Sequence, residues 1–167
     1  MQMSLFNFEP IQPKEIKKMP YLYMAYGSNM NQEQMKNRCP YAVYKGLIKL
    51  PKWRLVFKGV ADCIPDAKKS TPIALWEITN DCEERLDRYE GFPRLYRKEH
   101  FKNSKGQTFM MYVMNRHDIA EPPQHYFECI QQGYKDCGAD ETYLNEALLH
   151  SYQNGTNGGH IPKRYKL

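Results

Sequence analysis

The sequence has no long hydrophobic run, no repeat and no paired-cysteine motif, and these absences remove several classes of protein. No apolar run reaches the ~18 residues that a membrane-spanning helix needs. The five cysteines are an odd number and no two are spaced Cys-x-x-Cys, which argues against a disulfide framework and a zinc site. Residues 1–20 hold three prolines and no apolar segment typical of a signal peptide. We expect a reduced, cytoplasmic protein without a metal.

The charge is not concentrated anywhere along the chain. Lys and Arg number 24 against 19 Asp and Glu, and the basic residues are scattered instead of forming one block. Scattered basic residues give only a weak indication of nucleic-acid binding, and an ordinary solvated surface explains them more simply. We therefore expect neither nucleic acid nor a membrane as partner.

What the chain does contain suffices for one folded domain. Its 167 residues are 41% hydrophobic and 26% charged, which fits neither a disordered chain nor a membrane protein. Aromatic residues, at 13%, favour β-rich structure and a site lined by rings. We predict an N-terminal extension over residues 1–19, in which Phe6 and Phe8 are able to dock, a domain over 20–154 and a tail over 155–167.

Apolar runs, turn residues and helix caps predict strands that mostly follow strands. We expect helices from the Asn31 cap to about residue 38, over 81–89, over 125–136 and after Asp140. Strands are expected over residues 21–26, 43–50, 53–57, 72–78, 96–102 and 107–114. This order favours an α+β fold on a curved, largely antiparallel sheet or small mixed β-barrel flanked by helices.

The first candidate site is the turn Tyr26-Gly27-Ser28-Asn29. A strand ends there, Gly27 permits a tight path, and a capped helix follows. Free backbone N–H groups at such a turn hold a carboxylate or an oxyanion. The alternative is a plain strand-to-helix turn in which Ser28 and Asn29 satisfy nearby backbone groups. Ser28 does not lie in a Gly-x-Ser-x-Gly elbow, so we do not expect a nucleophile.

The second candidate is Glu90, at the end of the helix predicted over 81–89. Residues three and four apart share a helix face, so Glu90 continues the apolar face of Cys82, Leu86 and Tyr89. Burial and the negative end of the helix dipole would both raise its pKa. Such a carboxyl could take and return a proton near neutral pH. The alternative is an ordinary exposed glutamate at a frayed helix end.

Other polar residues are expected to have structural roles. The five histidines show no metal-ligand spacing. Asp62 and Asp66 flank Cys63-Ile64-Pro65, which we place in a loop after Gly59, and a turn role is favoured over metal binding.

Several segments form a combination that is more specific than any one of them. They are YLYMAYGSNM at 21–30, GVADCIP at 59–65, IALWEIT at 73–79, LDRYEGFPRLYRK at 86–98, MMYVM at 110–114 and PPQHYFECIQQGYKDCG at 122–138. With these segments in this order, the chain resembles the γ-glutamylcyclotransferase-like (AIG2-like) family.

The resemblance implies a mixed α/β barrel with the active site at its mouth, and an enzyme without a cofactor. Such an enzyme cyclises a γ-glutamyl group and releases 5-oxoproline with an amine or amino acid. The family's catalytic glutamate falls on Glu90, and a substrate-contacting tyrosine of some members falls on Tyr126. The substrate-holding loop falls on Tyr23, Met24, Ala25, Tyr26, Gly27, Ser28 and Asn29.

The expected reaction is intramolecular, because the substrate's α-amine attacks its own γ-carbonyl, so the protein need only fold a small γ-glutamyl peptide or amine into shape. Glu90 would carry the proton. The leaving group stays open, and a homodimer is possible. Arg94 and Arg97 could meet a substrate carboxylate or lie on an exposed strand edge. The alternative function is a non-catalytic module that binds γ-glutamyl or carboxylate ligands on the same fold.

Overall fold

A six-stranded curved sheet forms the centre of the molecule in a computed structural model that describes residues 8–11 and 21–155. Its strand order is β1-β5-β6-β2-β4-β3, with β2 parallel to β6 and every other pair antiparallel. The strands are β1 (Glu9–Pro10), β2 (Tyr21–Ala25), β3 (Val43–Lys58), β4 (Val60–Ile78), β5 (Tyr96–Lys102) and β6 (Thr108–Met114). The predicted α+β class with a curved, largely antiparallel sheet is confirmed.

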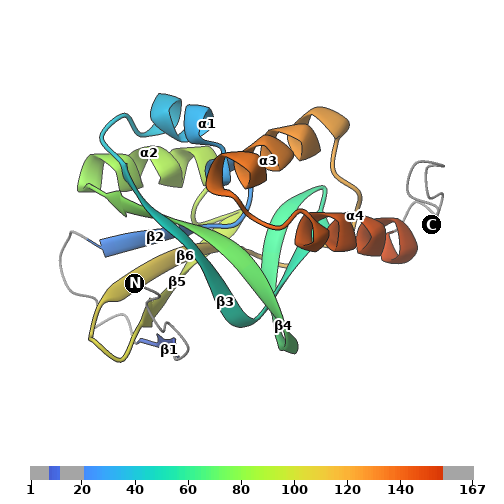
Figure 1. Cartoon of the computed structure of the whole chain (residues 1–167), viewed down its shortest axis with the longest axis horizontal. Coiled ribbons are helices and arrows are strands. Elements are labelled where there is room, and N and C mark those ends of the chain that lie inside the picture. The colour runs from blue at the N-terminus through green and yellow to red at the C-terminus, as the bar shows by residue number, and fades with distance from the viewer. Residues whose placement is uncertain (1–7, 12–20, 156–167) are drawn as a thin grey trace.

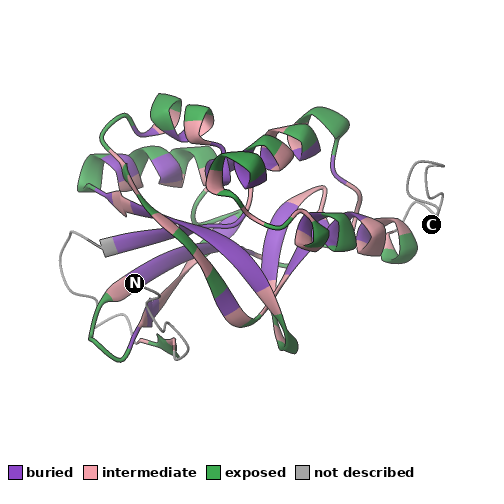
Figure 2. Cartoon of the chain, viewed as in Figure 1, coloured by how far each residue is buried: buried purple, intermediate pink, exposed green. Residues whose placement is uncertain are grey.

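The helices are gathered around this sheet (Figure 1). They are the one-turn η2 (Ser28–Met30), α1 (Gln32–Arg38), α2 (Asn80–Glu90), α3 (Gln124–Cys137) and α4 (Thr142–Asn154). Figure 1 shows α1, α2 and α3 on one side of the sheet and α4 beside the β3–β4 hairpin. The strands of the sheet carry most of the buried residues, as the purple ribbon of Figure 2 shows.

Local signals set the ends of the two helices nearest the candidate turn. Asn31 caps α1, because its side chain accepts from the backbone N–H of Gln34. Thr79 caps α2 through the N–H of Cys82, so this helix begins one residue earlier than predicted. Gly91 ends α2 in the left-handed conformation with φ +66°, which glycine adopts without strain. Glu90 is therefore fixed as the last residue of α2.

The β3–β4 hairpin differs from the prediction. The two strands expected over 43–50 and 53–57 are one strand with a bulge at Lys52, whose φ is +64°. The loop expected after Gly59 is instead the first half of β4, so Asp62 and Asp66 lie in a strand. Residues 64–70 are largely exposed and polar and show no strand-like alternation. Ile64, Pro65 and Ser70 pair with β3, and the register of that pairing shifts between Pro65 and Ser70.

The described part of the N-terminal extension packs on the sheet edge. β1 pairs with β5, and the ring of Phe8 stands edge-on to Phe109 with the centroids 5.1 Å apart. Phe8 thus docks on the domain, whereas Phe6 lies outside the described residues. The domain boundaries themselves stay predictions.

Candidate active site

A cavity of about 170 Å³ lies where the end of β2, the end of α2 and the start of β4 meet. β2 lies between β6 and β4 in the sheet, so the chain that leaves it starts from the protein interior. The residues that line the cavity are Tyr23, Tyr26, Gly27, Ser28, Asn29, Val60, Ala61, Tyr89, Glu90, Leu95, Tyr96, Tyr112 and Tyr126. The two segments singled out in the sequence therefore share one cavity.

Glu90 brings a carboxyl group to this cavity. Cys82 and Leu86 are buried on the same face of α2, which explains why the last residue of this helix points inward. Burial raises the pKa of Glu90 from its ordinary 4.5 to about 7, against the lowering effects of the Arg38 charge and a hydrogen bond from Asn29. Within the described residues Glu90 forms no ion pair. Its carboxyl can therefore exchange a proton near neutral pH.

Asn29 joins the turn to the rest of the site. Its Nδ2 donates to Glu90 Oε1 at 3.2 Å and to the hydroxyl oxygen of Tyr23 at 2.9 Å. Its backbone carbonyl accepts from the indole of Trp76 at 3.0 Å. Arg38 donates to the Asn29 side-chain oxygen and to Ser28 Oγ. The turn is thus held by side chains from α1, α2, β2 and β4.

Gly27 allows the turn to pass close to β4 and α3. A Cβ atom at this position would lie 3.1 Å from the Cβ of Ala61 and 3.5 Å from the hydroxyl of Tyr126. Ser28 and Asn29 open η2, and backbone N–H groups at the start of a helix have no acceptor inside it. This turn combines open space with backbone donors, which suits the oxygen atoms of a bound acid or amide.

Two tyrosine hydroxyls are placed by the backbone of Ala61. Tyr126 accepts from the Ala61 N–H at 3.0 Å, and Tyr96 donates to the Ala61 carbonyl at 2.7 Å. Burial raises the pKa of both phenols, so both are neutral in the physiological range. Because the Tyr126 oxygen already accepts, its own O–H can donate to a ligand.

The second pair of rings comes from the sheet. Tyr26 donates to the carbonyl of Tyr112 at 2.6 Å, and the hydroxyl of Tyr112 donates to Asp87 at 2.5 Å. Lys98 holds that carboxylate in turn, with Nζ 2.8 Å from Asp87 Oδ1. These contacts tie the wall of the cavity to the outer face of α2.

Most residues of the predicted site lie along the cavity. Glu90, Tyr23, Tyr26, Gly27, Ser28, Asn29 and Tyr126 line it, and their roles with substrate stay predictions. Met24 and Ala25 do not line it but are buried in the core, at 0% and 1% exposure. Side chains alternate across a strand, so Met24 points away from the side of Tyr23, and Ala25 is too short to reach the cavity.

Sequence reasoning missed Ala61, Arg38 and the rings of Tyr96 and Tyr112. Tyr96 lies within the EGFPRLYR segment that carried the family resemblance, which was the available signal. Ala61 and Tyr112 lie within the GVADCIP and MMYVM segments of the same resemblance, so the signal was available for them too. Arg38 lies in none of these segments, and contacts between distant parts of the chain bring it to the site. Arg97 lies outside the cavity lining, where it pairs with Glu99 and donates to the Met114 carbonyl.

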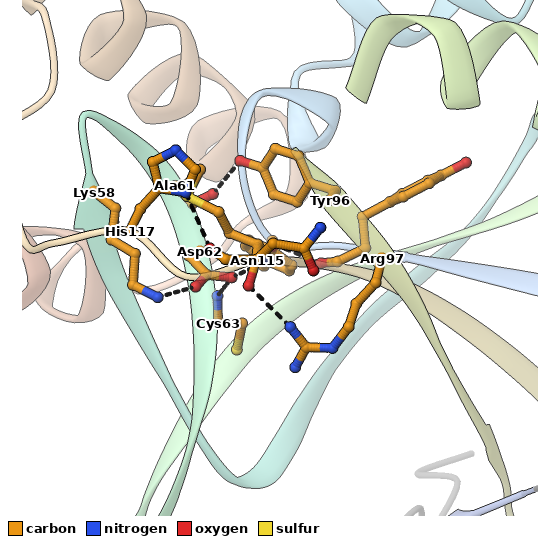
Figure 3. Close-up of polar contacts among 11 residues, drawn as sticks. Lys58, Ala61, Asp62, Cys63, Tyr96, Arg97, Asn115 and His117 are labelled. Atoms are coloured by element: carbon orange, nitrogen blue, oxygen red, sulfur yellow. Dashed lines mark hydrogen bonds and ion pairs between the residues drawn. The ribbon is translucent and has the colours of Figure 1, made fainter. Parts of the chain in front are cut away.

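Asp62 is a buried anchor beside the cavity and not part of a turn (Figure 3). Its side chain accepts from the backbone N–H groups of Cys63 and Met114, both at 2.8 Å, and pairs with Lys58 at 2.7 Å. Because Met114 belongs to β6, the carboxylate fastens β4 to that strand. The anchored residue follows Ala61 directly, so Asp62 also fixes the backbone that holds the two phenols.

The described ranges contain neither a metal-binding cluster nor a membrane-spanning helix. Within residues 8–11 and 21–155, no three His, Cys, Asp or Glu side chains gather into a group able to hold a metal ion. Over the same residues no helix has both the length and the apolar character needed to cross a membrane.

Known proteins resemble this chain in sequence. The family model for "Gamma-glutamyl cyclotransferase, AIG2-like" matches residues 23–133. A mouse gamma-glutamylcyclotransferase is 25% identical over 140 residues, which are 74% of each chain.

Solved structures share the fold. One gamma-glutamyl cyclotransferase superposes with a TM-score of 0.67 and 20% identity, over 88% of this chain and 96% of its own. YkqA from Bacillus subtilis superposes with a TM-score of 0.64 and 21% identity, over 82% of this chain and 56% of its own. Because the family match runs from Tyr23 through Glu90 to α3, and thus spans the cavity, the chain belongs to the gamma-glutamyl cyclotransferase, AIG2-like family.

Proposed function

We propose that this protein is a γ-glutamyl cyclotransferase that converts a γ-glutamyl amine or amino acid into 5-oxoproline and the free amine. The observation that carries the proposal is the Glu90 carboxyl, which lines a cavity opposite the Gly27–Asn29 turn and has its pKa raised to about 7 by burial. Family membership supports the same chemistry.

The reaction needs one proton carrier and no nucleophilic side chain. Glu90 takes a proton from the substrate's α-ammonium, and the free amine attacks the γ-carbonyl carbon. Glu90 gives this proton to the leaving nitrogen, and the bond from the γ-carbon to that nitrogen breaks. Glu90 then takes the second proton from the new ring nitrogen and passes it to the released amine. Overall, the attacking nitrogen loses two protons and the leaving nitrogen gains two, so no water is consumed. Ring closure is intramolecular, so binding in a folded shape supplies much of the rate.

The turn and Tyr126 supply donors for substrate oxygens. The backbone N–H groups at Gly27 and Ser28 suit either the α-carboxylate or the oxyanion that develops on the γ-carbonyl. The Tyr126 O–H is a further donor on the same cavity. The leaving group, the possible homodimer and the cytoplasmic location stay predictions.

The first experiment incubates the protein with γ-glutamyl amino acids, γ-glutamyl-ε-lysine and glutathione and measures 5-oxoproline and the released amine. Glu90→Gln keeps the shape of the side chain but cannot carry the proton, so turnover should fall by about 10²–10⁴-fold. Glu84→Gln is the matched control, because Glu84 lies exposed on the same helix.

Two results would count against the proposal. Equal turnover in Glu90→Gln and wild type would remove Glu90 from the mechanism. Tight binding of these compounds without any 5-oxoproline would instead indicate a non-catalytic module that uses the same cavity.

A further inference from the structure

We propose that Arg38 is a positioning residue for this site: its guanidinium fixes the side-chain amide of Asn29, so that Asn29 always presents N–H to Glu90 and Tyr23. The structural part of this inference is independent of substrate, and its kinetic part rests on the proposed function.

Arg38 is held against both halves of the site. It is the last residue of α1, and its Nη1 donates to Asn29 Oδ1 and, at 3.0 Å, to Ser28 Oγ. Its guanidinium carbon lies 3.5 Å from the ring centroid of Tyr89, the neighbour of Glu90 on α2. The guanidinium therefore bridges the turn after β2 and the end of α2.

The orientation of Asn29 follows from the chemistry of arginine. A guanidinium has only donors, so the atom of Asn29 that faces Arg38 is the carbonyl oxygen. The amide nitrogen must then face the opposite way, toward Glu90 Oε1 and the Tyr23 hydroxyl. Without Arg38 the amide is free to turn over, which would place its oxygen against the carboxylate.

This orientation decides which atoms of the site are open to a substrate. Tyr23 accepts from Asn29, so its own O–H is left to donate. Oε1 of Glu90 accepts from Asn29, and among the described residues no donor is recorded on Oε2. The geometry thus assigns proton transfer to Glu90 Oε2.

Among the described residues, Arg38 is the cation whose charge lowers the pKa of Glu90. Five other groups on the cavity are phenols whose pKa is raised by burial, so that they are neutral near pH 7; they are Tyr23, Tyr26, Tyr96, Tyr112 and Tyr126. The phenol of Tyr89 also lines the cavity, where its ring contacts the Arg38 guanidinium. Asp62 acts on the Tyr26 and Tyr96 phenols, and Asp87 on Tyr112. Loss of the Arg38 charge, and of the Asn29 donor that it holds, should therefore raise the pKa of Glu90.

The test compares Arg38→Met with Lys36→Gln, which removes a positive charge from an exposed position of the same helix. The titration of the Glu90 carboxyl is followed by NMR in substrate-free protein labelled with ¹³C-glutamate, and the signal is assigned by its loss in Glu90→Gln. We expect the midpoint to rise by about one pH unit in Arg38→Met, to return toward wild type in Arg38→Lys and to stay unchanged in Lys36→Gln.

The kinetic readout is the pH profile of kcat/KM. The apparent pKa of its acidic limb should rise by the same amount as the NMR midpoint of Glu90. A general loss of activity with an unmoved limb would indicate a merely structural role and overturn the inference. So would an unmoved NMR midpoint in Arg38→Met, or an equal shift in Lys36→Gln. If Arg38→Met does not fold, Arg38→Gln replaces it, because glutamine removes the positive charge and the forked N–H donors of the guanidinium but keeps a polar side chain.

A failure of the proposed function gives a different signature. If wild type makes no 5-oxoproline from any γ-glutamyl compound, the proposed reaction is wrong. The NMR titration still decides whether Arg38 acts on the Glu90 carboxyl, because that arm uses no substrate.

Discussion

Two inward-facing carboxyl groups near the cavity, Asp62 and Glu90, have opposite surroundings. Asp62 is 0% exposed and has three partners: two backbone N–H groups and the ammonium of Lys58. Glu90 faces open space and accepts one hydrogen bond, from Asn29. Both belong to segments of the family resemblance, so the sequence alone does not separate their roles.

The two carboxyl groups differ in whether both oxygens already accept hydrogen bonds or pair with a cation. A buried carboxylate whose oxygens are satisfied holds strands together and has no site for a ligand proton. A buried carboxyl with an open oxygen on a cavity ionises at a cost, which raises its pKa toward the range where protons are exchanged. On this basis Asp62 is expected to contribute stability and Glu90 to contribute chemistry.

The largest expected effect tests the stabilising carboxyl. Asp62→Ala leaves two buried N–H groups and Lys58 without their acceptor, so the free energy of unfolding should fall by about 3–5 kcal/mol. Asp62→Asn keeps an oxygen for the N–H groups and should lose less. Urea denaturation measures both, with Asp66→Ala on the same strand as the control, expected to lose less than about 1 kcal/mol. Equal losses at Asp62 and Asp66 would show that the buried carboxylate of Asp62 adds no more stability than that of the control residue.

A second prediction uses the pH dependence of stability. Between pH 4.5 and about 7, folded Glu90 keeps a proton that the unfolded chain has released. The contribution of Glu90 to the free energy of unfolding should therefore fall with rising pH in this window, by up to about 1.4 kcal/mol per unit. Glu90→Gln lacks this contribution, so its stability relative to wild type should rise with pH and level off above about 7. A difference that does not vary with pH in urea denaturation would contradict the buried state of this carboxyl.

The smallest effect concerns Ala61, which lies between the two carboxyl environments. Tyr126→Phe removes the acceptor of the Ala61 N–H and a donor on the cavity. We expect a loss of about 1 kcal/mol in stability and about tenfold in kcat/KM. Tyr41→Phe is the control, because Tyr41 is 76% exposed. Unchanged kinetics in Tyr126→Phe would exclude its hydroxyl from substrate binding.

Local signals made much of the fold predictable. The Asn31 cap, the Gly91 stop and the turn between β5 and β6 each act within a few residues, and the structure has them close to where the sequence indicates. The first half of β4 was missed because residues 60–65 are held in the strand by pairing with β3, and such pairing leaves no local period in the sequence.

The sequence by itself determined the family resemblance, the strand-to-helix turn at Gly27 and the inward face of α2 that ends at Glu90. The resemblance rests on the order of short segments along the chain. For the turn and the helix face, spacing within a single element suffices, because the interacting residues are neighbours in the chain. Only the tertiary structure decided that both oxygens of Asp62 have partners, that an oxygen of Glu90 is open to the cavity, and that Arg38 reaches Asn29. These properties depend on contacts between distant strands and helices, and short-range patterns in the sequence do not specify such contacts.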